Sequence, residues 1–143
     1  MKKIIIILFI LVFWSCSTSK KDSTSNNKLV VQNEKDTIRI ANDSLEYEII
    51  IFEPGFNSWL SSAARPRGYY SQNYLESRNR IYVREYNMRV AQPSLYNPSL
   101  YEMRIDYQDT INYGYEVNYL LYNYFIYFQL TYKQKLGSFT PRP

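Results

Sequence analysis

The sequence predicts a small single domain of the α+β class, with an N-terminal β-hairpin or small sheet packed on two aromatic-rich helices. Two patterns and their order support this fold class. Residues 37–53 alternate between apolar and polar in the manner of strands, whereas residues 71–90 and 111–136 repeat apolar residues at helical spacing. Strands that are followed by helices, rather than alternating with them, are typical of α+β folds.

The hairpin is expected over residues 37–53, where the segment TIRIA shows the alternation of a strand. Asn42, Asp43 and Ser44 would form the turn, since their side chains favour turns. The second strand ends at Pro54 and contains the consecutive apolar residues IIIF. A continuous apolar run predicts that this strand is buried on both faces.

A helix is predicted over residues 71–90, and Pro93 closes this segment because proline disfavours helix in the residue that precedes it. The expected apolar face comprises Tyr74, Leu75, Ile81, Tyr82, Tyr86 and Met88. The expected polar face comprises Asn73, Asn79, Arg80 and Asn87. Charged residues also fall within the apolar face, and two of them have the spacing of a helical ion pair. We therefore predict a structural ion-pair cluster of Arg78, Glu85 and Arg89.

Residues 111–136 fit both a helix and a strand. Apolar residues recur at helical spacing at Val117, Leu121, Tyr124, Phe125 and Phe128. Residues 122–132 also alternate, and their aromatic composition favours a strand, whereas the length of the segment favours a helix. We expect a helix through about Phe128, with residues 126–135 open between helix and strand. Asp109 is expected to cap the start of this helix.

The N-terminus predicts export. Two lysines precede the apolar run from Ile4 to Trp14, which is too short to cross a bilayer, for which a helix needs about 20 residues. Cys16 follows and resembles the acylated cysteine of bacterial lipoproteins, although Phe13 and Trp14 depart from the usual pattern. An ordinary signal peptide with a free thiol is the alternative.

The expected division is a signal peptide at 1–15, a lipidated cysteine and flexible polar tether at 16–36, one globular domain at 37–137 and a C-terminal tail at 138–143. Ser17 stands where an aspartate would resemble an inner-membrane retention signal. Lys20 and Lys21 replace the acidic cluster that resembles a surface-export signal. These residues favour an outer-membrane lipoprotein that faces the periplasm over one exposed at the cell surface.

Three segments carry a resemblance to a known family: YEIIIFEPGFNSWL, ARPRGYYSQNYLESRNRIYVREYNMR and NPSLYEMRIDYQDTINYGYEVNYLLYNYF. Together they resemble a family of small uncharacterised lipoproteins from Bacteroidetes, over residues 37–136. The resemblance implies a location in the cell envelope and a single domain. Because the family carries no established activity, the resemblance implies no catalytic residue.

The composition excludes much familiar catalytic chemistry. The chain has no histidine, and its single cysteine is the one expected to be acylated, so the nucleophile–histidine pairs and nearly all zinc sites are excluded. No glycine-rich phosphate loop is present, and we expect no cofactor and no metal. A carboxylate-based hydrolase with Asp106 and Asp109 is the enzyme hypothesis that the residues allow.

Charge divides the chain into two parts. Residues 36–64 contain five acidic residues against one arginine, whereas residues 65–104 contain seven arginines against three glutamates. The arginines could pair with the hairpin's acids and stack on tyrosines, or face an anionic partner. The candidate ligand-binding residues are Trp59, Arg65, Arg67, Tyr69 and Tyr70.

The sequence thus predicts a membrane-anchored envelope lipoprotein that serves as a non-catalytic accessory or interaction module. Its expected partners are the membrane, through N-terminal acyl chains, and an envelope protein or an anionic glycan. Export argues against a nucleic-acid partner. The first alternative is a binding module for an anionic glycan, lipid or peptidoglycan group, and the second is the carboxylate-based hydrolase.

Overall fold

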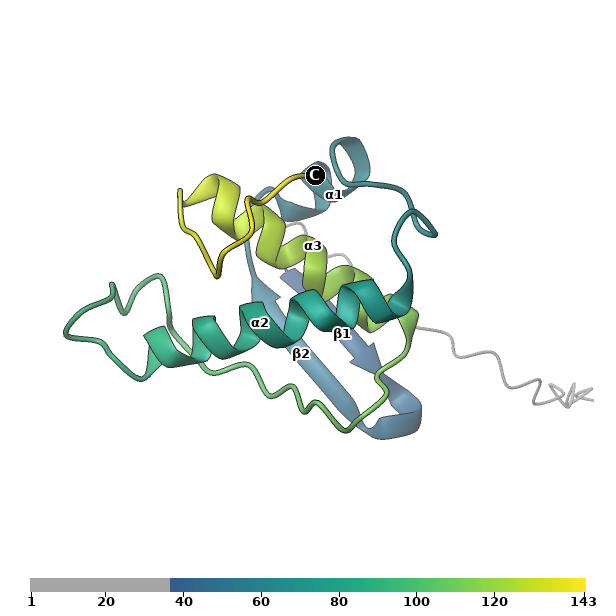
Figure 1. The fold of residues 1–143 in the computed structure, drawn as a ribbon, viewed down its shortest axis with the longest axis horizontal. Helices are drawn as coiled ribbons and strands as arrows, with labels where there is room; N and C mark the ends of the chain where they lie inside the picture. Colours follow the sequence, from purple (N-terminus) through teal and green to yellow (C-terminus); the bar gives the residue numbers. More distant parts are fainter. Residues whose placement is uncertain (1–36) are drawn as a thin grey trace, which may run out of the picture.

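The computed structural model describes residues 37–143, and the predictions for residues 1–36, including Cys16, lie outside this range. The elements in chain order are β1 (Thr37–Asn42), the short 3-10 turn η1 (Asp43–Leu45), β2 (Tyr47–Phe52), α1 (Phe56–Ser62), α2 (Gln72–Val90) and α3 (Tyr115–Thr131). The strands form a two-stranded antiparallel sheet and precede the helices (Figure 1), which confirms the α+β class and the single small domain. No helix within residues 37–143 is long and apolar enough to cross a membrane.

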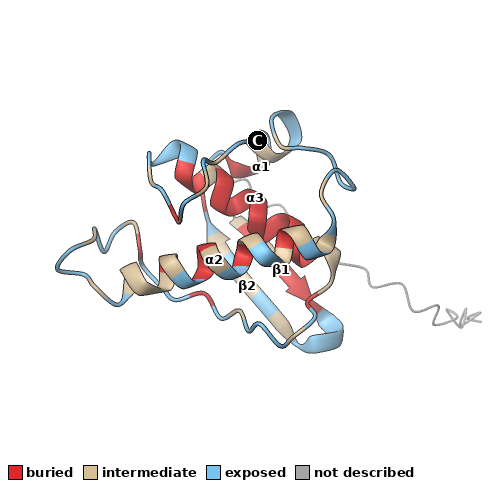
Figure 2. Cartoon of the chain, viewed as in Figure 1, coloured by how far each residue is buried: buried red, intermediate tan, exposed pale blue. Residues whose placement is uncertain are grey.

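Helix α3 is the centre of the fold. It contacts α2, β1 and α1 (Figure 1), and twelve of its seventeen residues are buried. Figure 2 shows burial along most of its length, and a helix that is apolar around its whole circumference is stable only when it is enclosed. The helix–strand ambiguity of residues 126–135 is thereby resolved, because the helix continues to Thr131 and a turn follows.

The hairpin matches its predicted position, with Ile38 opposite Ile51 and Arg39 opposite Ile50. The predicted burial of the second strand on both faces is wrong. Ile38 is fully buried toward the helices, whereas Ile50 and Phe52 point to the other face and are 59% and 72% exposed. Strand residues alternate between faces, and no described element covers the outer face of this sheet.

The loop expected between the sheet and the first long helix begins as the short helix α1. Gly55 precedes it with φ = 82°, a conformation that glycine adopts without strain. A Cβ atom on this residue would also lie only 3.0 Å from the hydroxyl of Tyr127. That hydroxyl donates a hydrogen bond of 2.6 Å to the carbonyl of Pro54, so α3 fixes the end of the sheet.

Helix α2 lies at its predicted position, and Ser71 caps its start, because the Ser71 hydroxyl accepts a hydrogen bond from the backbone N–H of Tyr74. The predicted apolar face is confirmed at Leu75, Tyr82 and Tyr86, whereas its other residues are only partly buried. The buried residues of α2 are Leu75, Asn79, Tyr82, Val83 and Tyr86. Asn79 was assigned to the polar face, but it is fully buried and donates to the backbone and side chain of Asn118 on α3. The spacing of apolar residues does not predict the burial of a polar residue that pairs across a helix interface.

The segment before α3 also differs from prediction. Gly114, not Asp109, occupies the position before the first residue of α3, and no side chain caps this helix.

The segment after α3 packs back on the domain. Leu136 is buried, and its N–H donates a hydrogen bond of 2.7 Å to the side chain of Gln129. Phe139, within the predicted tail, packs 3.3 Å beneath the guanidinium of Arg78.

Candidate functional site

Arg67, a predicted ligand-binding residue, is bound to an acid of the same domain. Its Nε donates hydrogen bonds of 2.8 and 3.0 Å to the two carboxylate oxygens of Glu116, and its Nη2 also contacts that carboxylate. The guanidinium lies 4.6 Å from the ring centroid of Tyr119. The hydrogen bonds that Arg67 donates to Glu116 raise the pKa of Arg67. The charge of this arginine therefore has a two-point partner on α3 and is not available to an anion.

The other predicted ligand-binding residues fall into two groups. Arg65 lies 5.1 Å from the centroid of the Tyr69 ring and donates 3.0 Å to the carbonyl of Pro143. Tyr70 packs edge-on against Tyr69, with centroids 4.7 Å apart. Trp59 belongs to a different cluster on α1, beside Phe56 and Tyr127. The structure thus gathers Arg65, Tyr69 and Tyr70, and it places Trp59 apart from them.

The predicted charged cluster is divided in the same way. Glu85 and Arg89 form the expected ion pair at 2.8 Å. Arg78 is not part of it, because its guanidinium lies between the rings of Tyr74 and Phe139. The acids of β2 and of the turn do not pair with the arginines of residues 65–104. Two of them, Asp43 and Glu48, bind Arg39 of β1 within the hairpin instead.

Arg89 is the most extensively bonded of the arginines with described contacts. Its side chain is 11% exposed, and besides Glu85 it donates to the hydroxyl of Tyr101 at 2.8 Å and the backbone carbonyl of Lys135 at 2.6 Å. It also lies over the ring of Tyr96. These contacts join the end of α2 to the segments before and after α3, which is a structural role.

The two carboxylates of the hydrolase hypothesis have different surroundings. Asp109 lies 3.8 Å from the guanidinium of Arg80, in an exposed ion pair. Asp106 is exposed, and its backbone carbonyl accepts a hydrogen bond from Tyr47. Of these two carboxylates, Asp109 lines a surface groove that is described below, and Asp106 lines neither that groove nor the second one found within residues 37–143. Within the same residues, no three acidic side chains come close enough together to hold a metal ion.

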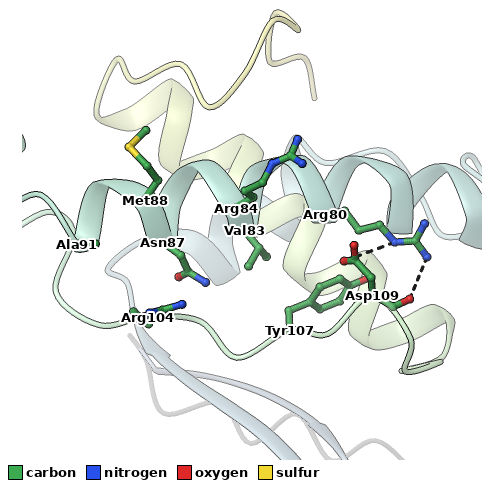
Figure 3. Close-up of a pocket in the computed structure, with 9 residues that line it drawn as sticks. All are labelled: Arg80, Val83, Arg84, Asn87, Met88, Ala91, Arg104, Tyr107 and Asp109. Atoms are coloured by element: carbon green, nitrogen blue, oxygen red, sulfur yellow. Dashed lines mark hydrogen bonds and ion pairs between the residues drawn. The ribbon is translucent and has the colours of Figure 1, made fainter.

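A groove of about 400 Å³ lies between α2 and the segment that leads into α3 (Figure 3). We call it the arginine groove. Its lining residues are Arg80, Val83, Arg84, Asn87, Met88, Ala91, Arg104, Tyr107 and Asp109. Arg84 stands on the α2 rim and Arg104 on the opposite rim, and neither has an ion pair, hydrogen bond or ring contact with a described residue. With Arg80 opposed by Asp109, the groove keeps an excess of two positive charges.

Side-chain hydrogen bonds fix the rim that carries Arg104. Asn87 on α2 donates 2.8 Å to the carbonyl of Ile105 and accepts 2.8 Å from its N–H, which clamps this backbone to the helix. Tyr107 donates 2.7 Å to the buried amide of Asn118. Burial raises the pKa of Tyr107 to about 12, so its hydroxyl stays protonated at neutral pH. The loop rim is therefore held at two points on either side of Asp106.

Sequence reasoning did not single out Arg84 or Arg104. One signal was present: the residues three and four positions from Arg84 on its helix are Arg80, Ile81, Asn87 and Met88, none of them acidic. An arginine without an acid at helical spacing has no local ion pair. No comparable signal exists for Arg104, because its position opposite α2 depends on the Asn87 clamp.

Aromatic and aliphatic surface lies beside the free guanidinium groups. Val83 on the floor is buried, and Met88 and Tyr107 are partly buried. A guanidinium presents donors that match a carboxylate or a phosphate at two points. The arginine groove is thus suited to a small ligand with one anionic group and an apolar or ring-shaped body.

Comparisons with curated proteins and with solved structures find no match for this chain. A protein-family model matches residues 4–141, nearly the whole sequence. The match agrees with the expected membership of an uncharacterised family. The chain belongs to DUF6146, a family of unknown function.

Proposed function

We propose that this protein is a membrane-anchored lipoprotein of the cell envelope whose domain binds an anionic glycan group in the arginine groove and catalyses no reaction. One observation carries the binding proposal: Arg84 and Arg104 flank a groove and have no partner among residues 37–143. The envelope location follows from the signal-like N-terminus and Cys16 in the sequence.

The contrast among the arginines supports this choice of site. Arg67 and Arg89 are bound to Glu116 and Glu85, so an anion at either would have to displace a carboxylate that the fold holds in place. At Arg84 and Arg104 an anion displaces only water. Hydrogen bonds that involve a charged group contribute about 1.5–3 kcal/mol each, which is enough for a measurable affinity from two guanidinium groups.

The ligand class follows from charge and size. A groove of about 400 Å³ is at the small end of ligand sites, the size of one or two sugar units. In a bacterial envelope, sugars with phosphate or carboxylate groups are the anions of this size. Their shared chemistry is a planar or tetrahedral oxyanion on a ring, which arginine binds at two points while Tyr107 packs on the ring face.

Calorimetric titration of the full chain in detergent tests the proposal in two arms, glucosamine phosphate and N-acetylmuramic acid, with neutral N-acetylglucosamine as the reference. We expect at least one anionic sugar to bind, and each of Arg84→Ala and Arg104→Ala to weaken that binding about tenfold or more. The arm that binds distinguishes phosphate from carboxylate recognition.

A matched control is Arg65→Ala, which removes an arginine that is also exposed but lies outside the groove. It should bind the anionic sugar as the wild type does. The binding proposal fails if neither anion binds better than the neutral sugar, or if Arg84→Ala retains the wild-type affinity.

Metabolic labelling with an alkyne fatty acid tests the anchor separately. The wild-type chain should be labelled and Cys16→Ala should not. Equal labelling of the two chains would contradict acylation at Cys16 and would leave the groove experiment unaffected.

A further inference from the structure

The outer edge of strand β2 is unpaired. The sheet has only two strands, and among the described residues every backbone hydrogen bond of Tyr47–Phe52 goes to β1. An edge strand of six residues therefore presents free N–H and C=O groups along its outer side. Such an edge is a template on which another strand can pair.

A second groove of about 410 Å³ runs along this edge, and we call it the edge groove. Strand β2 forms one wall, and the segment that follows α2 passes beside it (Figure 1) and contributes Leu100 and Met103 to the other wall. Buried aromatic rings of α2 and α3, including Tyr86 and Phe128, form the floor. The space beside the free backbone is therefore apolar.

Large apolar side chains on the rims of the edge groove are exposed to solvent. Ile50, Phe52 and Met103 are 59%, 72% and 71% exposed. Each could be removed from water by a strand that pairs with β2. Apolar residues that are exposed together beside a groove are typical of interaction sites, whereas single exposed residues are common on any surface.

The charge of the edge groove indicates the kind of partner. Glu53 lies at the end of β2, is 7% exposed, and has one hydrogen-bond donor, the hydroxyl of Tyr132 at 2.8 Å. Glu102, on the opposite wall, is exposed and has no described partner. Both carboxylates contribute to raising the pKa of Tyr86 on the floor, although its burial is the larger cause. Arg104 is the one basic residue among those that line the edge groove, so the lining carries two acids against one base.

We propose that β2 accepts an extended segment of a partner protein as an added strand, and that this segment carries apolar side chains and a Lys or Arg that pairs with Glu53 or Glu102. Main-chain hydrogen bonds to the free edge supply affinity. Alternate side chains that enter the edge groove supply specificity, because strand residues point to opposite faces in turn. This site shares Arg104 with the arginine groove but does not include Arg84, so the two proposals are tested with different variants.

A second copy of the chain fits the edge groove less well than a basic partner segment does. The edge strand and its flanks read EYEIIIFE, with acidic residues and no basic one. Pairing two copies of β2 would bring acid toward acid, which is unfavourable for residues that lie opposite each other. A basic partner segment has the complementary charge.

Fluorescence anisotropy of a labelled probe peptide, acetyl-KVTVKVTK-amide, tests the proposal on the full chain in detergent. Two matched peptides serve as references, one with Glu in place of every Lys and one with N-methyl groups on alternate backbone nitrogens. We expect the Lys peptide to bind, the Glu peptide to bind at least about tenfold more weakly, and the N-methylated peptide to lose binding.

Variants of the protein complete the test. Phe52→Ala combined with Met103→Ala should weaken peptide binding by about tenfold or more without changing the melting temperature, since both side chains are largely exposed. The control is Leu95→Ala, which removes an apolar side chain that is 76% exposed and lies outside the edge groove. Leu95→Ala should bind the peptide as the wild type does.

Three results would overturn the proposal: equal binding of the Lys and Glu peptides, full binding of the N-methylated peptide, or full binding by the double variant. Sedimentation of the chain without peptide gives a fourth. If the wild type forms a dimer that the double variant does not form, the edge groove takes a second copy and not a basic partner segment.

Discussion

Helix α2 carries two arginines five positions apart whose surroundings are opposite. Arg89 is 11% exposed on its side chain and donates hydrogen bonds to Glu85, Tyr101 and Lys135. Arg84 is exposed at the rim of the arginine groove and has no described partner. The comparison shows that one residue type in one helix can hold the fold together at one position and remain available to a ligand at another.

The difference arises from what the rest of the chain places opposite each residue. Segments on both sides of α3 converge on Arg89, because Tyr101 precedes that helix and Gln134 follows it. Across the groove from Arg84 the chain places Arg104, which is another base and not an acid. A buried guanidinium without partners is strongly destabilising, whereas an exposed one is hydrated by water, so only the exposed position can be left free for function.

The largest effect is expected for Arg89→Met. The substitution removes hydrogen bonds to several polar groups and leaves Glu85 partly buried without its counter-charge, so we expect a loss of about 2–4 kcal/mol in the free energy of unfolding. Urea denaturation of the full chain measures it. A loss below about 0.5 kcal/mol, the range of ordinary surface substitutions, would show that the Arg89 contacts do not stabilise the domain.

Arg67→Ala should have a smaller effect. Its pair with Glu116 has two-point geometry, but the side chain of Arg67 is 55% exposed, and exposed ion pairs contribute about 0.2–1 kcal/mol. Packing on Tyr119 adds to this, and we expect a total loss of about 1 kcal/mol. A double-mutant cycle with Glu116→Gln isolates the pair, and a coupling energy of zero would contradict the assignment of Arg67 to a structural role.

Glu53 is a buried acid, and its described partner is the neutral hydroxyl of Tyr132 and not an arginine. Burial raises the pKa of Glu53 above its usual value of 4.5. The folded state then holds a proton that the unfolded state releases, so the contribution of this group to stability is complete below pH 4.5 and is lost as pH rises through the folded pKa.

Glu53→Gln should therefore make the domain more stable than the wild type at pH 7 and not at pH 4, because glutamine keeps an oxygen for the hydroxyl of Tyr132. Thermal melts at the two pH values measure the difference. An equal effect at both pH values would show that the substitution acts through packing and not through the charge.

The smallest effect is expected for Arg84→Met, which is the matched partner of Arg89→Met on the same helix. The free energy of unfolding should stay within about 0.5 kcal/mol of the wild type, as for surface positions without partners. The same urea denaturation measures it. A loss as large as that of Arg89→Met would mean that Arg84 is part of the fold and would remove the basis of the proposed binding site.

The fold was predictable where local pattern and burial agree. The hairpin and both long helices lie where alternation and helical spacing place them. The buried face of α2 was predicted only in part, because the burial of Asn79 depends on its pairing with Asn118 across the helix interface. The state of the last segment depended on α3 being enclosed on several sides, which only the assembled fold determines.

The candidate site was predictable only in its chemistry. The seven arginines of residues 65–104 indicated an anionic partner, within the chain or outside it. Which arginines are satisfied depends on contacts between distant segments, such as Arg67 with Glu116, 49 positions away. The sequence favoured Arg65 and Arg67 because they flank a proline, whereas the free pair is Arg84 and Arg104.

The most direct test of this account is an NMR titration that follows the side-chain Nε–Hε signals of the arginines in the full chain. With glucosamine phosphate and N-acetylmuramic acid added in separate experiments, the account predicts that the signals of Arg84 and Arg104 shift and saturate together with at least one of them. The signals of Arg67 and Arg89 should stay in place, since their carboxylate partners hold them. Shifts at Arg65 and Arg67 with none at Arg84 and Arg104 would contradict it.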